Sequence, residues 1–162
     1  MNEEFPEIDQ IIDRIIEAGL AKRELIEPCS DDEVAQLQQL QPSVTLPSDY
    51  IYFMKKAGKI PIRYFNVALS IRPALFAVDT AEEMIDSDNN FDLSDKLFIG
   101  LYKFDAVYYF KKGESGVYCF DEVEELKEAD TFTEFLKEQT DISIRDHIGA
   151  IEFANMFKNT KP

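Results

Sequence analysis

Residues 46–58, with the sequence LPSDYIYFMKKAG, constrain the fold more than any other stretch of the chain. Proline lacks a backbone N–H and its fixed φ suits the first helical position, so Pro47 predicts the start of a helix. Asp49 then lies in the first turn, where its charge opposes the positive end of the helix dipole. Gly58 favours a left-handed cap at the other end. Apolar residues at three- and four-residue spacings predict one buried face, formed by Leu46, Tyr50, Phe53, Met54 and Ala57.

Two amphipathic helices are predicted ahead of this stretch. In residues 5–18, isoleucines fill one face and polar residues the other, and Gly19 ends the pattern. We expect this helix to pack on the core; the alternative is that it binds a partner. Farther along, Ser30 and Glu33 form a capping box, in which each side chain satisfies a backbone N–H of the other residue. Pro42 ends the helix that follows, whose apolar face consists of Val34, Leu37 and Leu40.

The middle of the chain is predicted to hold strands and one short helix. Residues 61–71 are rich in β-branched and aromatic side chains, so they predict one strand or two short ones. Pro73 is expected to break that run. Thr80 and Glu83 then repeat the capping-box pattern, which predicts a short helix that ends near residue 86.

Three further strands are predicted at residues 97–102, 106–110 and 117–120, with a glycine-containing turn at residues 111–116. Alternation places large apolar side chains on both faces of these strands. Two arrangements follow: either the sheet is covered on both sides, or one aromatic face is partly open for binding. Tyrosine suits the second arrangement, because it joins a large apolar ring to a polar tip.

Two helices are predicted near the C-terminal end. Thr131 and Glu134 form a third capping box, which opens a helix that carries Phe132, Phe135 and Leu136. A separate last helix of about three turns is expected from Ile144, Ile148, Ile151, Phe153, Met156 and Phe157. A chain of 162 residues suits one domain, residues 1–162. The predicted fold class is α+β: a mostly antiparallel sheet of about five or six strands, from residues 60 to 120, packed by N- and C-terminal helices.

The order of several motifs resembles the SUKH superfamily (SMI/KNR-like). Cys-Ser-x-x-Glu-Val at residues 29–34 is followed by Leu-Pro-x-Asp-Tyr at residues 46–50. An aromatic strand, a turn and a Val-Tyr strand come next, then an acidic connection and Thr-Phe-x-x-Phe-Leu at residues 131–136. The resemblance covers residues 28–138. Members of this superfamily are immunity proteins of bacterial polymorphic toxin systems and related fungal regulators of cell-wall synthesis.

This resemblance implies an immunity protein that binds a cognate toxin domain and neutralises it by protein–protein contact. It does not fix the toxin, because superfamily members neutralise several toxin classes. The alternative that it leaves open is a regulatory or scaffold protein-binding module of the same fold, without a toxin. A neighbouring toxin gene, or co-purification with a basic protein, would distinguish the two.

The net charge of the chain indicates which kind of partner to expect. The chain has 32 Asp and Glu against 17 Lys and Arg, which gives a net charge of −15. Such a field repels nucleic acid and anionic membranes and attracts basic proteins, although acidity can also serve solubility alone. We therefore expect a cognate toxin with a basic surface, for example a nuclease, and no nucleic-acid or membrane partner. The chain itself is expected to be a monomer or a weak dimer.

Acidic residues concentrate in residues 79–95 and 121–130, which flank the aromatic strands. The spacing of the side chains at residues 86–90 partly matches a calcium loop, but Phe91 stands where that loop needs glycine. We interpret both stretches as solvated loops or as a face for a basic partner, with exposed tyrosines as anchors. The candidate partner-binding residues are Asp79, Glu82, Asp86, Asp88, Asp92, Tyr102, Tyr108, Tyr118, Asp121, Glu122, Glu124 and Glu125.

No motif in the sequence predicts catalysis. A phosphate loop and a dinucleotide fingerprint are missing, and glycine is scarce at 6 residues. His147 is the only histidine, and Cys29 and Cys119 lack nearby metal ligands in the sequence. The acidic start is unlike a secretory signal, and no stretch is apolar enough to span a bilayer. We therefore expect free thiols in a cytoplasmic protein, and no catalytic residues, metal or cofactor.

Overall fold

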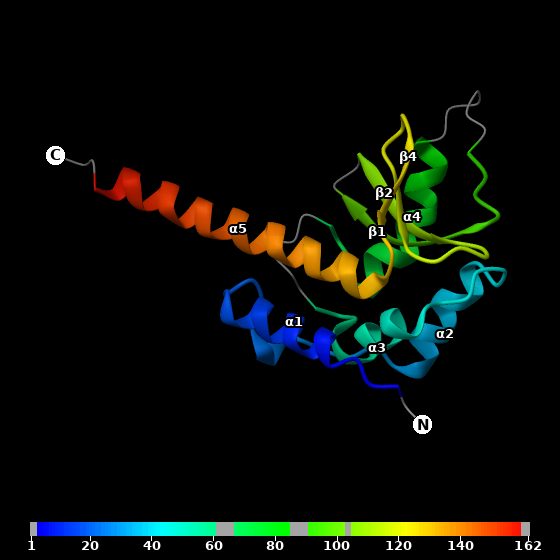
Figure 1. Cartoon of the computed structure of the whole chain (residues 1–162), viewed down its shortest axis with the longest axis horizontal. Coiled ribbons are helices and arrows are strands. Elements are labelled where there is room, and N and C mark those ends of the chain that lie inside the picture. Colours follow the sequence, from blue (N-terminus) through cyan, green and yellow to red (C-terminus); the bar gives the residue numbers. More distant parts are fainter. Residues whose placement is uncertain (1–2, 61–66, 85–90, 103–104, 160–162) are drawn as a thin grey trace.

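The computed structural model describes residues 3–60, 67–84, 91–102 and 105–159 (Figure 1). Five α-helices, one short 3-10 helix and a four-stranded sheet lie within these residues, and they confirm the α+β class. In chain order they are α1 (Pro6–Glu17), η1 (Arg23–Leu25), α2 (Asp31–Leu40), α3 (Ser48–Ala57), α4 (Ile71–Met84), β1 (Lys96–Tyr102), β2 (Ala106–Lys111), β3 (Val117–Phe120), β4 (Glu125–Ala129) and α5 (Phe132–Lys158).

The sheet is an antiparallel meander in the order β1-β2-β3-β4. The turn between β2 and β3 uses Gly113 and Gly116, whose φ angles of 72° and 102° are easy only for glycine. At Gly116 a Cβ atom would also lie 2.3 Å from the Ala129 carbonyl oxygen, so the strands close around this residue. The acidic stretch 121–130 contains the last strand, β4, which the composition of the sequence did not predict.

Both faces of the sheet are covered, which is the first of the two arrangements considered above. One face contributes Leu97, Ile99, Tyr108, Phe110, Val117 and Cys119 to the main core with α1, α2, α3 and the first half of α5. The other face contributes Phe98, Val107, Tyr109, Tyr118 and Phe120 to a second cluster under α4. Helices therefore cover both faces of the aromatic strands, and Figure 1 shows α4 against the sheet and α1, α2 and α3 grouped below it.

The strand prediction for residues 61–71 was wrong over its described part. Residues 61–66 lie outside the described residues; beyond them only Ala68 makes a strand-like bridge, to Leu101 of β1. Ile71 already begins α4. The described sheet thus has four strands rather than five or six.

Helix α4 also corrects the prediction of a short helix opened by Thr80. Pro73 lies in the first turn of α4, where its missing N–H leaves no helical bond unmade, so it does not break the chain. Thr80 and Glu83 lie inside the helix rather than at its start. Three buried alanines at helical spacing allow α4 to approach the sheet closely: Ala74, Ala77 and Ala81.

The α3 helix joins the layers. Tyr50 and Phe53 are fully buried, and the Tyr50 ring packs edge-on against Phe110 of β2 and Phe132 of α5. The carboxylate of Asp49 accepts hydrogen bonds from the backbone N–H and hydroxyl of Thr133, at 2.9 and 3.0 Å. Asp49 therefore caps a second helix 84 residues away, in addition to lying in the first turn of its own. Both helices of the N-terminal prediction, α1 and α2, are confirmed, and the α1 isoleucine stripe is buried.

Gly58 ends α3 for a reason other than the predicted left-handed cap. Its φ is −62°, an ordinary right-handed value. A Cβ atom there would lie 2.4 Å from the Cys29 sulfur and 2.5 Å from the Met54 carbonyl oxygen. Glycine is required because the chain before α2 crosses closely over the end of α3, where the Cys29 N–H also donates to the Met54 carbonyl. Pro47, predicted at the first helical position, lies one residue earlier, at the N-cap.

The two predicted C-terminal helices are one continuous helix of 27 residues, α5. Its capping residue Thr131 accepts from the Glu134 N–H at 3.1 Å, but the predicted capping box is only half formed, because the Glu134 carboxylate accepts from the Asp130 N–H instead. No proline interrupts the segment that follows, so the helix continues beyond the core. Its first half is buried, whereas its second half extends away from the rest of the molecule (Figure 1).

We predict opposite effects of two changes at Tyr50. Its hydroxyl is buried and has no hydrogen-bond partner among the described residues. Tyr50→Phe removes this unsatisfied group and should leave the free energy of unfolding unchanged or raise it by up to ~1 kcal/mol. Tyr50→Ala, like Phe53→Ala, should lower it by roughly 3–5 kcal/mol. Urea unfolding measures all three; a large loss with Tyr50→Phe would show that the hydroxyl has a partner.

A second prediction concerns the Asp49 cap. Asp49→Ala leaves two donors of Thr133 unsatisfied at the start of α5, so unfolding should become easier by about 1–3 kcal/mol. Asp49→Asn keeps an accepting oxygen and should lower the free energy of unfolding by less. The matched control is Asp32→Ala, which removes an exposed acid from the first turn of α2 and should change stability by no more than about 0.5 kcal/mol. Equal losses in Asp49→Ala and the control would contradict the cap.

Candidate functional site

Two of the three tyrosines proposed as partner anchors are buried, and the third is half-buried. Tyr108 and Tyr118 are each only 8% exposed, and Tyr102 is half-buried. Tyr108 packs against Phe135 of α5, and Tyr118 donates its hydroxyl to Glu114 at 2.6 Å. Alternation predicted correctly which strand residues share a face, but burial follows from α4 and α5, which the strand sequence does not contain.

The acidic residues of the first predicted segment lie on two elements. Asp79 and Glu82 are exposed on α4 and make no hydrogen bond or ion pair with other described residues. Asp92 precedes β1, and its carboxylate accepts from the Ser94 N–H and hydroxyl, which lowers the pKa of Asp92. Asp86 and Asp88, and the calcium-like spacing around them, lie outside the described residues.

The connection between β3 and β4 forms an ordered acidic tip, residues 121–124. The Asp121 carboxylate accepts from the Glu124 and Val123 backbone N–H groups at 3.0 and 3.1 Å, and these bonds lower the pKa of Asp121. Glu122 holds a left-handed φ of 74°. Val123 is 85% exposed between the acidic side chains of Glu122 and Glu124. An apolar side chain therefore stands among carboxylates that have no described ion pair.

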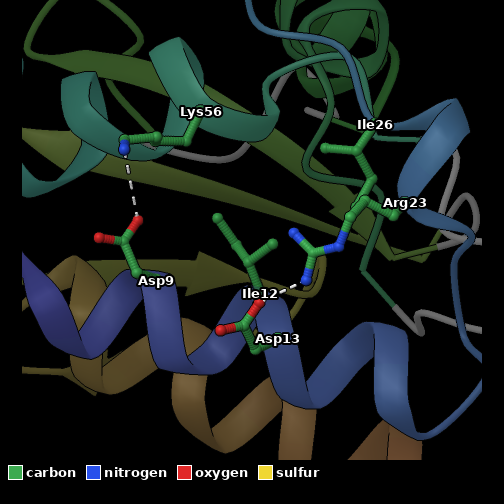
Figure 2. A pocket seen from close by; sticks show the side chains of 6 residues that line it. All are labelled: Asp9, Ile12, Asp13, Arg23, Ile26 and Lys56. Carbon is green, nitrogen blue, oxygen red and sulfur yellow. Dashed lines mark hydrogen bonds and ion pairs between the residues drawn. The ribbon is translucent and has the colours of Figure 1, made fainter.

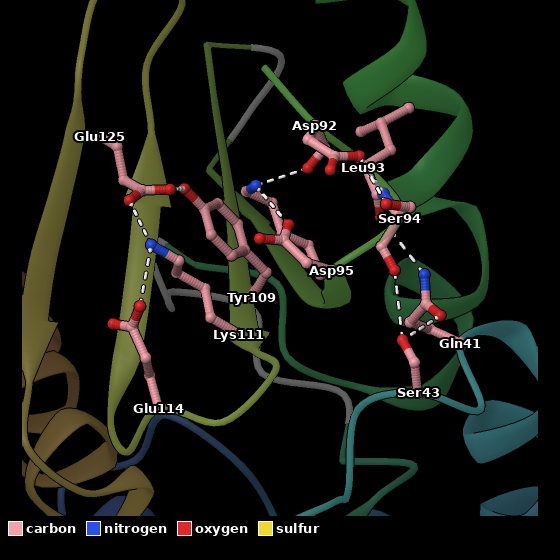
Figure 3. Close-up of polar contacts among 11 residues, drawn as sticks. Gln41, Ser43, Asp92, Leu93, Ser94, Asp95, Tyr109, Lys111, Glu114 and Glu125 are labelled. Atoms are coloured by element: carbon pink, nitrogen blue, oxygen red, sulfur yellow. Dashed lines mark hydrogen bonds and ion pairs between the residues drawn. The ribbon is translucent and has the colours of Figure 1, made fainter. Parts of the chain in front are cut away.

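Glu125 belongs instead to a polar cluster beside the second core, shown in Figure 3. Its carboxylate accepts from the Tyr109 hydroxyl at 2.6 Å and from the Lys111 ammonium at 2.8 Å. Burial raises the pKa of Glu125, but the hydrogen bonds from Lys111 and Tyr109 outweigh burial, and its pKa lies below the usual value. Lys111 also pairs with Glu114 and lies over the Tyr118 ring.

A second lysine neutralises the opposite side of this cluster. Lys96 is 5% exposed, pairs with Asp95 at 2.7 Å and lies over the Phe91 ring, 4.5 Å from its centre. Its ammonium also donates to the Asp92 carbonyl. The loop after α2 is tied to the same region, since Gln41 and Ser43 donate to the carbonyls of residues 93 and 94 (Figure 3).

These lysines are the functional detail that sequence reasoning missed. A signal was present, because Lys111 stands two residues after Tyr109 and therefore on the same strand face. The contacts of these lysines separate the predicted acidic residues into two groups, those with internal contacts and those exposed. Asp92 and Glu125 are held by internal contacts. Asp79, Glu82, Glu122 and Glu124 keep exposed carboxylates without a hydrogen bond or ion pair to the described residues.

A surface cavity of about 380 Å³ lies between α1, η1 and α3 (Figure 2). Its charged walls are already paired: Lys56 lies 3.7 Å from Asp9, and Arg23 lies 2.6 Å from Asp13. Ile12 and Ile26 complete the lining. Because each charged side chain has an opposite charge across the cavity, this site leaves no uncompensated charge to recognise a ligand.

In the described part of the chain, both cysteines are buried and the histidine is half-buried. Cys29 and Cys119 are buried free thiols. Burial, and then Glu33, raise the pKa of Cys29 to about 11; burial, and then Glu128, raise that of Cys119 to about 12. His147 lies half-buried on α5. Within the same residues, His, Cys, Asp and Glu form no group that could hold a metal ion. The described helices include none with the length and apolar character to cross a membrane.

Comparison with protein families gives a match over most of the chain. The SMI1 / KNR4 family (SUKH-1) matches residues 28–138. This range begins just before α2 and ends in the buried half of α5, so it contains α3, α4 and the whole sheet. The match confirms the resemblance found in the motifs. No curated protein matches the chain.

We predict that both thiols resist alkylation in the folded chain. A thiol reacts as its thiolate, and pKa values of about 11 and 12 leave very little thiolate at pH 8. Iodoacetamide should therefore modify the native chain at least ~100-fold more slowly than the urea-unfolded chain. Mass spectrometry after unfolding without reductant should show two modified cysteines. Rapid native labelling of either residue, or an unmodified bridged species, would contradict this.

Proposed function

The chain belongs to the SMI1 / KNR4 family (SUKH-1), and from this premise we propose that it is an immunity protein. It binds a cognate toxin domain and neutralises it by protein–protein contact, without catalysing a reaction. The observation that carries the proposal is the family match over residues 28–138. The motifs within that range form the structural centre of the domain, from the Ser30 capping box through α3 to the start of α5.

The partner that best fits the charge is a toxin with a basic surface. The net charge of −15 creates a field that attracts a basic protein over distance and speeds the encounter. A nuclease is one such partner, because carboxylates can occupy the positions where its substrate phosphates bind. The two free thiols support a cytoplasmic location, where such a complex would form.

The contact surface that we propose consists of α4 and the acidic tip. Asp79 and Glu82 supply exposed carboxylates on α4, and Glu122 and Glu124 supply them on the tip. Val123 adds an apolar contact that water does not compete for, at the centre of the tip charges. The tyrosines serve as core residues that hold the strands beneath this surface, and Glu125 and Asp92 keep the lysines in place.

A regulatory or scaffold module remains the second candidate, because the superfamily also contains fungal regulators. It would use the same surface for a different protein partner. Pull-down from the native cell separates the two candidates. Recovery of a toxin domain encoded next to this chain supports the immunity function, and recovery of a cell-wall or signalling protein in its place supports the module.

We predict that reversing four exposed acids slows association with the basic partner. The variant carries Lys at positions 79, 82, 122 and 124, which moves the net charge by +8, from −15 to −7. Its association rate should fall by roughly tenfold or more at low salt and by less at high salt, because screening shortens the field to about 8 Å at physiological ionic strength. Surface plasmon resonance at two salt concentrations measures both rates.

The matched control reverses four other exposed acids, Glu17, Glu24, Glu27 and Asp32, and changes the net charge equally. These residues lie around α1, η1 and α2, so the control should keep most of the wild-type rate. Equal slowing in both variants would assign the effect to net charge alone. Unchanged rates in both would remove the acidic tip and α4 from the interface.

A further inference from the structure

The outer half of α5 carries large apolar side chains that the domain does not cover. Helix α5 leaves the core after Ser143, its last buried residue, and extends away from the other helices (Figure 1). Five large apolar residues beyond that point are each between 48% and 68% exposed: Ile148, Ile151, Phe153, Met156 and Phe157. A contiguous apolar surface of this kind marks an interaction site.

The exposed surface continues the face that the first half of α5 buries. Phe132, Leu136, Gln139 and Ser143 follow one another at three- and four-residue spacings, and all are buried against the domain. The next turn of this face holds the polar residues Asp146 and His147, and beyond it residues 150, 153 and 157 are Ala, Phe and Phe. The apolar character of this face therefore resumes about one turn beyond the end of the core. The described residues of the domain leave this outer part largely exposed.

A second apolar stripe lies on another side of the same segment. It begins at Ile144, which still packs partly against the main core, and continues with the exposed Ile148 and Ile151 at spacings of four and three. Apolar residues thus occupy more than one face of residues 144–158.

The charge of this segment favours a second copy of the same chain as its binding partner. Residues 144–159 contain Arg145 and Lys158 against Asp146 and Glu152, so the segment is neutral while the remaining chain carries the net charge of −15. A basic partner is attracted to that remaining part, and anionic lipid finds no basic face on the segment. A neutral surface can pair with its own copy without repulsion. The acidic domains repel each other, which favours an arrangement that holds them apart.

We propose that residues 144–158 of two copies pack against each other antiparallel and form a weak homodimer. The antiparallel arrangement places the two acidic domains at opposite ends of the helix pair. A segment of this length spans about 22 Å and is about 10–12 Å wide, so one face buries on the order of 400 Å² per copy. This is about half the area per partner of a standard stable interface, and it corresponds to a transient, concentration-dependent dimer.

Sedimentation velocity over a concentration series of the full chain tests the proposal. The wild-type sedimentation coefficient should rise with concentration from that of the monomer toward that of the dimer. Phe153→Glu/Phe157→Glu should remain a monomer, with at least a tenfold weaker association. The matched control is Leu25→Glu/Leu40→Glu, which adds the same two charges at exposed apolar residues, 52% and 48% exposed, on η1 and α2. The control should associate like the wild type.

A spin label at Asn159→Cys tests the orientation, because Cys29 and Cys119 are buried and the wild type serves as the labelling control. Antiparallel helices separate the two labels by more than ~20 Å, whereas parallel helices bring them to ~10 Å. The shorter distance overturns the antiparallel arrangement. A wild type that stays monomeric overturns the dimer, and flotation of that monomer with phosphatidylcholine vesicles identifies lipid as the occupant. Loss of association in both double variants also overturns the assignment to α5.

Discussion

The carboxylate of Asp49 is the contact on which the arrangement of the layers depends. It lies in the first turn of α3 and is 9% exposed, so its oxygens need partners within the protein. One oxygen accepts from the Tyr50 N–H, and the other accepts from two donors of Thr133 at the start of α5. The cap fixes where α5 begins relative to α3. Tyr50, the next residue, can then place its ring between Phe110 of β2 and Phe132 of α5.

The second constraint is that an acidic chain must enclose a sheet whose two faces are both apolar. The main core covers one face with helices, but the cluster under α4 is bordered by carboxylates at residues 95, 114 and 125. Lys96 and Lys111 lie among these acids and over aromatic rings, where an ammonium interacts with both. These two lysines neutralise the border of the second cluster. The acidic side chains without a described ion pair, which can attract a basic partner, are therefore those on α4 and the acidic tip.

Local signals in the sequence predicted the helices with caps, and long-range packing decided the rest. The capping box at Ser30 and the cap at Thr131 placed the starts of α2 and α5 correctly, because their donors and acceptors lie within three residues. Alternation placed Tyr108 and Tyr118 on their strand faces but could not show that helices cover them. The role of Gly58 depends on Cys29, which is distant in sequence, so a local rule gave the wrong reason for it. The capping pattern at Thr80 placed α4 too late, because the helix begins at Ile71 and its buried alanines pack toward the sheet.

The two proposed interaction surfaces lie on different elements, and this separation has a physical consequence. The acidic tip precedes β4, whereas the apolar segment begins after Ser143, where α5 has left the core (Figure 1). Between them, the buried half of α5 is held by the Asp49 cap and by Phe132 and Phe135 in the core. A continuous helix transmits its orientation, because each turn is hydrogen-bonded to the next. Two copies joined through their α5 segments would present two acidic tips on a rigid spacer. Neither surface would be buried by the other, so a partner could bind the dimer as readily as the monomer, and a partner with two basic sites could bind both tips together.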